Sequence, residues 1–379
     1  MKSILFIMPN LSGGGAEKVL IEILKNFDYQ SYSVDLFLEY KIGIYINEIP
    51  SEVNVISPHK RLNLITKCLR KIQTLPIIKN LFYKFYLVPL LKRKTKNHYD
   101  AIISFMEGEA LKDHIAIKHK TLNNITWVHT DLKDNHWTVK HIFSTQEEKQ
   151  CYSEMNHIVF VSKEALKKFD SLYNIECNKT IIYNPIDKEN IIKCAQENPI
   201  KRPKSFIICA VGRLTHAKRF DRLIHVANLL KQENYNFEIW IMGKGELEKQ
   251  LKILCNKYNL NNEIKFLGFR TPPYPYINAA DILIRTSDAE AFSLVIAEAL
   301  CLGKPIISTK TAGPLELLEN GKYGILTNST NEDICNGIKS LIKSPNLYEH
   351  YQNLALKRSD YFDTPKQVVQ KIYNLITEL

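Results

Sequence analysis

Short apolar runs alternate along this chain with segments in which apolar residues recur every three or four positions. The run Ile4–Met8 is followed by the glycine-rich turn Ser12–Gly15 and by Ala16–Asn26, whose apolar residues fall on one helical face. An apolar run of this length predicts a buried strand, and the segment after it predicts an amphipathic helix. Repetition of this strand–helix pair predicts a parallel sheet with helices on both faces.

The pattern runs through the chain twice. Strands are predicted in the first half at Ile4–Met8, Val34–Leu38, Val53–Ile56, Ala101–Phe105, Asn124–Val128 and Ile158–Val161. They are predicted in the second half at Ser205–Val211, Phe237–Met242, Ile264–Leu267, Ile282–Arg285 and Pro305–Ser308. The polar stretch Asn184–Ser205 separates the halves and, with three prolines, predicts a linker. A chain of 379 residues also exceeds one ordinary core, so we expect two α/β domains. Ligands of such sheets bind beyond the carboxyl ends of the strands, which predicts a site in the cleft between the domains.

Two cations follow the first strand of the second half at a tight glycine turn. Gly212 precedes Arg213, and Lys218 lies five residues further on. Such a pair suits a diphosphate, because Arg binds phosphate through a planar fork and Lys as a point charge. Cations at strand ends are, however, often merely solvated. Gly243 and Gly245 follow the next strand and would let the backbone approach a ligand, although most such glycines only make turns.

The strongest chemical signal is a pair of glutamates separated by seven residues. Glu290 precedes a predicted helix and Glu298 lies inside it. A helix that begins near Phe292 would direct the amides of Ser293 and Leu294 toward an anion. Glu290 would then reach a sugar hydroxyl beside that anion, and Glu298 could accept from two ribose hydroxyls. A carboxylate that complements the helix dipole is the plainer explanation for Glu290. Glu298 has apolar neighbours, and since a buried carboxylate is costly without partners, we favour a ligand role.

These motifs resemble those of the retaining glycosyltransferases of family 4, and the match covers nearly the whole chain. The matching segments are Gly13–Glu17, Val159–Ser162, Tyr183–Asp187, Gly212–Lys218, Glu290–Glu298 and Gly303–Ser308. The resemblance implies the α/β GT-B fold, in which two Rossmann-like domains turn their parallel sheets toward a central cleft. We expect an acceptor-binding domain at residues 1–187, with a C-terminal helix at 360–379 packing back on it. A nucleotide-sugar-binding domain is expected at residues 188–359.

The resemblance also implies roles for individual residues. Arg213 and Lys218 would bind the donor diphosphate and stabilise the departing nucleotide, while Glu290 would contact the donor sugar and Glu298 the ribose. The donor site would be completed by Gly14, Gly15, Gly212, Gly243, Gly245, Ser293 and Leu294. The family commonly has Glu-Gly-Phe-Gly where this chain has Glu290-Ala291-Phe292-Ser293. This departure crowds the sugar pocket and leaves the transferred sugar open.

Two strand ends of the first half carry further candidates. His129 follows one of them, and a histidine at this kind of position contacts the donor sugar in the family, so His129 is a catalytic candidate. Glu107 follows another strand and could touch the acceptor hydroxyl, as could Asp131 and His136. A histidine with satisfied hydrogen bonds is the alternative for His129, and a solvated strand-end carboxylate is the alternative for Glu107.

No metal and no cofactor are expected. The sequence contains no Asp-x-Asp triplet and no Gly-x-x-x-x-Gly-Lys-Ser/Thr loop, which argues against a diphosphate held by a divalent ion and against a P-loop nucleotidase. Its eight cysteines are scattered without a Cys-x-x-Cys pair, which indicates a reducing compartment. Protein cations and a helix N-terminus would then stabilise the leaving group. Retention at the anomeric carbon follows from the resemblance alone.

The net charge of +11 comes from a single stretch of the chain. Residues 53–99 contain eleven Lys or Arg and no Asp or Glu, and without those eleven the chain has 40 basic and 40 acidic residues. In the basic segment, residues 60–96, apolar and aromatic residues interleave with the cations, and Pro76 and Pro89 divide it into short helices. Helices of this composition are typical of interfaces with anionic lipid, although a domain helix with a cationic outer face has the same composition. No nucleic-acid-binding motif is present, so nucleic acid is not an expected partner.

The sequence therefore predicts an enzyme that transfers a sugar from a nucleotide-diphosphate donor to a membrane-associated glycan acceptor. A uridine nucleotide is the expected donor. A lipid-linked intermediate of a surface polysaccharide is the expected acceptor. No apolar stretch reaches the ~18–20 residues of a membrane span, and we expect a cytoplasmic protein, peripheral on the inner face of the cell membrane.

Three alternatives remain open on sequence alone. A nucleotide-sugar 2-epimerase shares the fold but needs no acceptor and no basic segment. A dinucleotide-dependent dehydrogenase is suggested by Gly13–Gly15, but Gly-x-Gly-x-x-Gly is not satisfied because position 18 is Lys. A non-catalytic membrane-binding protein would give no reason for the pair Glu290 and Glu298.

Overall fold

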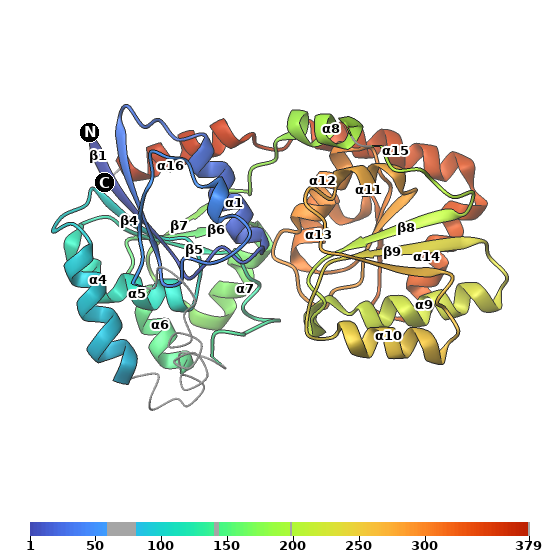
Figure 1. Cartoon of the computed structure of the whole chain (residues 1–379), viewed down its shortest axis with the longest axis horizontal. Coiled ribbons are helices and arrows are strands. Elements are labelled where there is room, and N and C mark those ends of the chain that lie inside the picture. Colours follow the sequence, from blue (N-terminus) through green and yellow to red (C-terminus); the bar gives the residue numbers. More distant parts are fainter. Residues whose placement is uncertain (59–80, 140–143, 198, 378–379) are drawn as a thin grey trace. The chain divides into compact units, whose positions relative to one another are not determined.

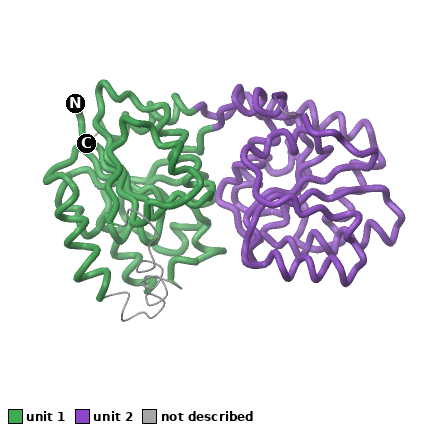
Figure 2. The backbone as a smooth tube through the Cα atoms, viewed as in Figure 1, with its two compact units in different colours: residues 1–185, 365–379 green, residues 186–364 purple. Residues whose placement is uncertain are grey.

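The chain forms two compact units, each built on one parallel sheet. The computed structural model describes residues 1–58, 81–139, 144–197 and 199–377 (Figure 1). Unit 1 comprises Met1–Pro185 and Pro365–Leu379, and unit 2 comprises Ile186–Thr364 (Figure 2). Six cations of the basic segment lie outside the described residues: Lys60, Arg61, Lys67, Arg70, Lys71 and Lys79.

Seven strands make up the sheet of unit 1, in the order β3-β2-β1-β4-β5-β6-β7. They are β1 (Lys2–Met8), β2 (Tyr32–Leu38), β3 (Asn54–Ile56), β4 (Ala101–Ser104), β5 (Asn124–Val128), β6 (His157–Phe160) and β7 (Asn178–Ile181). Every neighbouring pair is parallel. The central strands β1, β4 and β5 are almost wholly buried, as expected for a parallel sheet covered on both faces.

Helices cover both faces of this sheet. They are α1 (Gly15–Lys25), α4 (Val88–Lys94), α5 (Glu109–Ile117), α6 (Thr145–Ser153) and α7 (Lys163–Tyr173), with a π-helical turn at Tyr83–Leu87 before α4. Short 3-10 turns occupy Ile46–Glu48 and Lys118–Lys120. Serine side chains cap two of the helices: Ser162 Oγ accepts from the Ala165 amide at α7, and Ser144 forms a capping box with Glu147 at α6.

A helix from the far end of the sequence completes unit 1. Helix α16 (Pro365–Thr377) packs against α1. The ring of Tyr373 stacks on Tyr32 at 4.3 Å and meets Phe27 edge-on at 5.1 Å, and its hydroxyl accepts from the Asp28 amide at 2.6 Å. In Figure 2 the residues of this helix carry the colour of unit 1.

The sheet of unit 2 has six parallel strands in the order β10-β9-β8-β11-β12-β13. They are β8 (Phe206–Val211), β9 (Phe237–Met242), β10 (Ile264–Gly268), β11 (Ile282–Arg285), β12 (Ile306–Thr309) and β13 (Ile325–Thr327). The sheet carries α8 (Lys188–Glu197), α9 (Phe220–Gln232), α10 (Glu248–Lys257), α11 (Tyr274–Ala279), α12 (Leu294–Cys301), α13 (Ala312–Leu317), α14 (Asn331–Lys343) and α15 (Pro345–Ser359). Helices α9, α10 and α14 close one core around the apolar strands β8, β9 and β11.

The expected fold class is confirmed: both halves are α/β with a parallel sheet. Two strands lie beyond the prediction, β7 and β13, because neither is a buried apolar run; β7 is partly exposed throughout and β13 has three residues. The stretch predicted as a linker contains helix α8, whose Ile191 and Ala195 are buried in unit 2. Its polar composition belongs to the outer face of that helix.

Candidate active site

Unit 2 gathers the predicted donor-site residues at the carboxyl ends of its strands. Strand β8 ends at Val211 and is followed by Gly212 and Arg213, and Lys218 closes a short 3-10 turn at His216–Lys218. The neighbouring strand β11 leads into the loop that holds Glu290. Because β8 and β11 are parallel neighbours, their carboxyl ends bring Lys218 and Glu290 together across 72 residues of sequence.

One carboxylate oxygen of Glu290 receives three donors. Lys218 Nζ lies 2.8 Å from Oε1, Ser287 Oγ donates to Oε1 at 2.8 Å, and a guanidinium N–H of Arg285 donates to the same atom. Within the described part of the chain, Oε2 has no hydrogen-bond partner. The Glu290 side chain is 9% exposed, against 5% for Arg285 and 24% for Lys218. The cluster is therefore a nearly buried carboxylate with one oxygen held and one oxygen open.

The charges of this cluster shift one another. Burial raises the pKa of Glu290, but the positive charges of Arg285 and Lys218 outweigh it and lower the pKa to about 2. Burial also lowers the pKa of Lys218, opposed by Glu290 and reinforced by the charges of Arg285 and Arg213. Glu290 is consequently ionised throughout the physiological range.

Arg213 differs from the other cations of this region. It is exposed, and its side chain makes no hydrogen bond or ion pair with any residue that the structure describes. Arg219 and Arg222, by contrast, are tied to Asp288 through ion pairs at 2.9 Å. Arg213 is thus an exposed positive charge close enough to Lys218 to lower its pKa, an arrangement that favours an anionic ligand.

Packing within unit 2 already accounts for glycine at three of the predicted donor-site positions: Gly212, Gly243 and Gly245. A Cβ on Gly243, whose φ is +143°, would lie 1.9 Å from the carbonyl oxygen of Gly212, and one on Gly245 would lie 2.2 Å from that of Leu214. A Cβ on Gly212 would come within 2.9 Å of the Arg285 guanidinium. These glycines therefore let two loops meet and give the Arg285 side chain room.

Ser293 has a left-handed backbone conformation at the start of α12. Its φ is +76°, a conformation that costs L-residues energy and that glycine adopts freely. The Ser293 hydroxyl is buried without a hydrogen-bond partner in the described structure. Leu294 is the first residue of α12, two residues after the predicted start at Phe292, and Glu298 lies in the same helix with 4% of its surface exposed. The backbone geometry explains why a glycine would suit position 293.

In unit 1, His129 follows β5 as a neutral, half-buried residue. The ring packs against Phe105 at 4.9 Å and hydrogen-bonds to the Phe105 backbone, while Nε2 is buried without a partner among the described residues. Burial lowers its pKa to about 3, against the Phe105 hydrogen bond. His129 therefore offers an uncharged imidazole nitrogen at the carboxyl end of the sheet.

Glu107 is fully buried and holds the loop that carries His129. One carboxylate oxygen accepts from the His129 amide at 3.0 Å, and the other accepts from the Thr130 hydroxyl and, at 3.3 Å, from the Trp137 indole N–H. Burial raises its pKa, and these hydrogen bonds lower it less than burial raises it. A carboxylate engaged in this way positions the segment 129–137.

Asp131 and His136 are engaged with other side chains. Asp131 is 1% exposed and pairs with Lys168 at 2.5 Å. His136 Nε2 lies 2.9 Å from Glu148 Oε2 and 2.8 Å from the Tyr173 hydroxyl. Gly14 and Gly15 begin helix α1, where Gly14 leaves room for the buried carboxylate of Glu17.

Arg285 is a functional candidate that the sequence did not predict. Arg285 ends the otherwise apolar strand β11, and a cation at a strand end looks solvent-exposed in the sequence. Only the position of Lys218 and Glu290 in space shows that its side chain turns inward.

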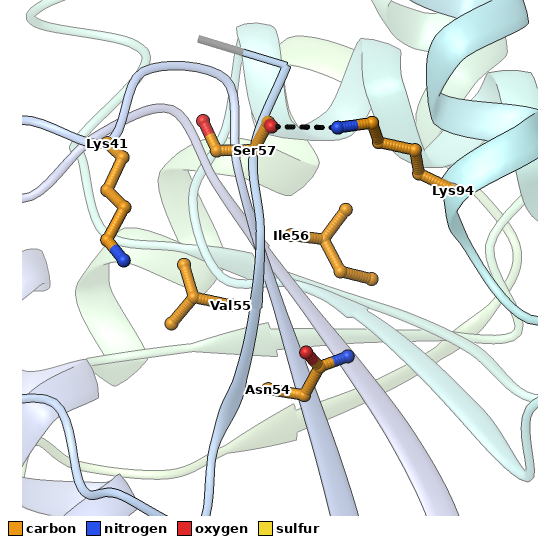
Figure 3. Close-up of a pocket in the computed structure, with 6 residues that line it drawn as sticks. All are labelled: Lys41, Asn54, Val55, Ile56, Ser57 and Lys94. Atoms are coloured by element: carbon orange, nitrogen blue, oxygen red, sulfur yellow. Dashed lines mark hydrogen bonds between the residues drawn. The ribbon is translucent and has the colours of Figure 1, made fainter. Parts of the chain in front are cut away.

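A pocket of about 520 Å³ in unit 1 contains none of these residues. It is lined by Lys41, Asn54, Val55, Ile56, Ser57 and Lys94, around the edge strand β3. Figure 3 shows Lys41 and Val55 on one side of the strand and Ile56 and Lys94 on the other, with Lys94 Nζ donating to the Ser57 carbonyl at 3.3 Å. The two ammonium groups do not converge on one point, and the pocket has no built anion site.

Part of unit 2 matches a known protein family. Residues 193–358, which include the cluster around Glu290, match the family "Glycosyl transferases group 1". A relative from Campylobacter jejuni is 25% identical to this chain over 97% of both chains; it is an N-acetylgalactosamine-N,N'-diacetylbacillosaminyl-diphospho-undecaprenol 4-alpha-N-acetylgalactosaminyltransferase.

Solved structures show that the chain has the GT-B fold. A crystal structure of Anabaena HepE in complex with UDP and glucose superposes with a TM-score of 0.79, at 21% identity and with both chains fully covered. The lipopolysaccharide outer core galactosyltransferase WaaB, in its apo form, gives a TM-score of 0.66 at 17% identity, covering 100% of this chain and 99% of WaaB.

Neither a cluster of metal ligands nor a membrane-spanning helix occurs in the described part of the chain. No cluster of three or more His, Cys, Asp or Glu residues suited to a metal ion occurs within residues 1–58, 81–139, 144–197 and 199–377. Within the same ranges, no helix has the length and apolar character needed to cross a bilayer.

Proposed function

We propose that this protein is a glycosyltransferase that moves a sugar from a UDP-sugar to a lipid-linked glycan in surface-polysaccharide synthesis. The transfer retains the anomeric configuration and needs no metal ion. The observation that carries the proposal is the cluster around Glu290, with exposed Arg213 beside it. It combines unpaired positive charge for a diphosphate with an ionised carboxylate whose second oxygen is open to a sugar hydroxyl.

Each donor-site residue has a role in this proposal. Arg213 and Lys218 bind the diphosphate and stabilise the negative charge that develops on the leaving nucleotide, which is the largest single contribution in many enzymes. Glu290 Oε2 accepts from a sugar hydroxyl, and Glu298 accepts from the ribose. The amides of Ser293 and Leu294 at the start of α12 face the diphosphate. The complex of HepE with UDP and glucose supports a uridine donor.

In unit 1, His129 Nε2 accepts from a donor-sugar hydroxyl, because a neutral imidazole nitrogen without a partner can accept a hydrogen bond. Glu107 positions the loop that carries His129. Asp131 and His136 are retained as candidates for acceptor contacts. Gly14 and Gly15 are retained as candidates for the donor site.

The acceptor assignment rests on the relative from Campylobacter jejuni, whose name includes diphospho-undecaprenol, and on the basic segment. In the described end of this segment three large apolar or aromatic side chains are exposed: Phe85 (70%), Leu81 (52%) and Tyr86 (41%). The cations Lys84, Lys92 and Arg93 of the same segment are also exposed. Aromatic and basic side chains in this mixture suit the surface of an anionic membrane. We therefore propose a peripheral protein on the cytoplasmic face of the cell membrane.

The function is tested by measuring UDP release from UDP-glucose, UDP-galactose, UDP-N-acetylglucosamine and UDP-N-acetylgalactosamine. Each donor is incubated with and without an undecaprenyl-diphosphate glycan extract and with excess EDTA. We expect release from one donor, dependent on the lipid extract and insensitive to EDTA, and a product whose new linkage has the donor's anomeric configuration by NMR. Sugar rearrangement without acceptor would instead establish the epimerase, and nicotinamide binding without UDP binding would establish the dehydrogenase.

Membrane docking is tested separately by co-sedimentation with vesicles. We expect binding to vesicles in which about one lipid in three is anionic, and loss of this binding at high salt. Equal binding to purely zwitterionic vesicles would refute the electrostatic docking.

A further inference from the structure

Glu290 has two cationic partners, and the two are held differently. Arg285 is 5% exposed, and besides Glu290 its guanidinium donates to the Val211 carbonyl and, at 3.2 Å, to Ser287 Oγ. Lys218 is 24% exposed, lies on a one-turn 3-10 segment, and has Glu290 as the side-chain partner of its ammonium. Arg285 is thus fixed in the protein, whereas Lys218 is free to exchange its partner.

This difference matters because the single ammonium group of Lys218 cannot pair fully with both the Glu290 carboxylate and a diphosphate. In the structure the Lys218 ammonium pairs with Glu290, while the proposed reaction requires it on the diphosphate. If Lys218 were the sole counter-ion, its departure would leave a nearly buried carboxylate without a positive partner, which is strongly unfavourable. Arg285 remains on the same carboxylate oxygen and removes that penalty.

The space for Arg285 is built into the site. Its guanidinium lies where a side chain at position 212 would otherwise reach, since a Cβ on Gly212 would approach it to 2.9 Å. Ser287, two residues further along the loop, completes the set of donors on Oε1. Three elements of unit 2 therefore cooperate to keep this arginine against Glu290: the end of β8, the end of β11 and the loop before α12.

We propose that Arg285 is the permanent counter-ion of Glu290 and that its presence lets Lys218 leave the carboxylate to bind the donor diphosphate. Arg285 is a positioning residue: it acts through Glu290 and Lys218 and does not touch the nucleotide. This inference rests on the proposed function, since it needs a diphosphate at Lys218.

The test measures the binding of UDP by calorimetry to the full chain and its variants. In R285Q, Lys218 is the sole cation on Glu290 and is held there, so UDP should bind at least roughly tenfold more weakly, the scale on which loss of a buried charge partner changes affinity. R285K, which keeps a positive charge, should recover most of the affinity. R222Q is the matched control, because Arg222 is a 7% exposed arginine that bonds to Thr286 and Asp288 and does not contact Glu290.

A second pair of variants separates the proposal from direct nucleotide contact. In E290Q no carboxylate retains Lys218, so UDP should bind at least as tightly as to the wild type. Adding R285Q to E290Q should then change the affinity by no more than about twofold, because Arg285 has nothing left to compensate. The double variant removes both charges of the buried pair, which folded proteins commonly tolerate, so this comparison stands even if R285Q alone does not fold.

The outcomes are distinct. Equal weakening of UDP binding in R285Q and R222Q would overturn the proposal, and so would a large loss from R285Q in the E290Q background, because Arg285 would then act on the nucleotide directly. Both results leave the proposed function standing, since the wild type binds UDP. Absence of UDP binding to the folded wild type would overturn the proposed function, and the role of Arg285 with it.

Discussion

Arg213 differs from Arg219, Arg222 and Arg285 because its side chain has no hydrogen bond or ion pair with any described residue. Its side chain is exposed and makes no ion pair in the described structure, so its removal should leave the fold unchanged and act on the chemistry alone. Whether an exposed cation has a ligand is decided by what its neighbours already satisfy. Arg219 and Arg222 are satisfied by Asp288.

Arg213→Ala should lower kcat/KM for sugar transfer by an amount that corresponds to about 2–4 kcal/mol of transition-state stabilisation, by analogy with other lost charge-stabilising donors. Steady-state kinetics with saturating acceptor measure the effect, and thermal unfolding should be unchanged. Lys249→Ala removes an exposed cation from α10 and serves as the control. Equal kinetics in both variants would contradict the assignment of Arg213 to the diphosphate.

Ser293 provides a prediction of increased stability. Ser293→Gly should stabilise unit 2 by about 1 kcal/mol, because glycine relieves the cost of the positive φ and removes a buried hydroxyl without a partner, while losing some entropy in the unfolded chain. The midpoint of thermal unfolding measures it. Asn174→Gly is the control: its φ is +45°, but asparagine tolerates this conformation, so the gain should be smaller. A larger gain at position 174 would refute the explanation.

At this scale the sequence reveals which residues carry charge but not which charges meet. The spacing of Glu290 and Glu298 and the pair Arg213 and Lys218 pointed to a diphosphate site. The ion pair between Lys218 and Glu290, and the inward turn of Arg285, depend on the alignment of two strands that are far apart in the sequence. Long-range contacts of this kind leave no local pattern.

Among the elements, helix α5 shows how a buried polar group ties a helix to its sheet. His114 on α5 is fully buried, with Nδ1 3.0 Å from Ser104 Oγ on β4 and Nε2 3.0 Å from Asn124 Oδ1 on β5. Burial lowers its pKa to about 4, although the Asn124 hydrogen bond raises it. The folded state therefore keeps this ring neutral at pH values where the unfolded chain binds a proton.

This shift predicts a specific pH dependence. As pH falls from 7 to 5, the unfolded state protonates His114 near pH 6.5 while the folded state does not, so stability is lost in that window. The free energy of unfolding of the wild type should fall by about 2 kcal/mol relative to His114→Gln, at about 1.4 kcal/mol per pH unit. Chemical denaturation at both pH values measures the difference. His119→Gln, at an exposed position, should show no such change, and a difference that is constant with pH would contradict the prediction.

The strands that the sequence predicted and those it did not differ in burial. Strand β1 is a nearly unbroken buried run and could be read directly from Ile4–Met8. Strand β7, Asn178–Ile181, is partly exposed and has one apolar residue, so its position is set by pairing with β6. Helix α8 was not predicted, because its polar outer face and flanking prolines are typical of a linker. Edge elements take their structure from their neighbours more than from their own pattern.

For the molecule as a whole, the main feature is that the chain leaves unit 1 at Pro185 and re-enters it at Pro365. The re-entry is anchored by Tyr373, through its stack on Tyr32 and the hydrogen bond from Asp28. Unit 1 therefore depends on residues that follow unit 2 in the sequence.

Tyr373→Ala should destabilise unit 1 by about 2 kcal/mol, less than a fully buried aromatic residue because its ring is half-buried. Differential scanning calorimetry should show the unit 1 transition lowered and the unit 2 transition unchanged. Tyr373→Phe keeps the stack and loses the acceptor for the Asp28 amide, so its effect should be intermediate. Tyr361→Ala, at a side chain 73% exposed, is the control. A shift in the unit 2 transition would refute the assignment of α16 to unit 1.

The return of the chain has a consequence for biosynthesis. On the ribosome, domains generally fold as they emerge, starting from the amino terminus. For this protein the nascent first unit must wait for α16, whose codons are translated only after the whole second unit has appeared. The face of α1 that packs against α16, and the rings of Tyr32 and Phe27, remain exposed during that interval, when a chaperone would have an apolar surface to bind.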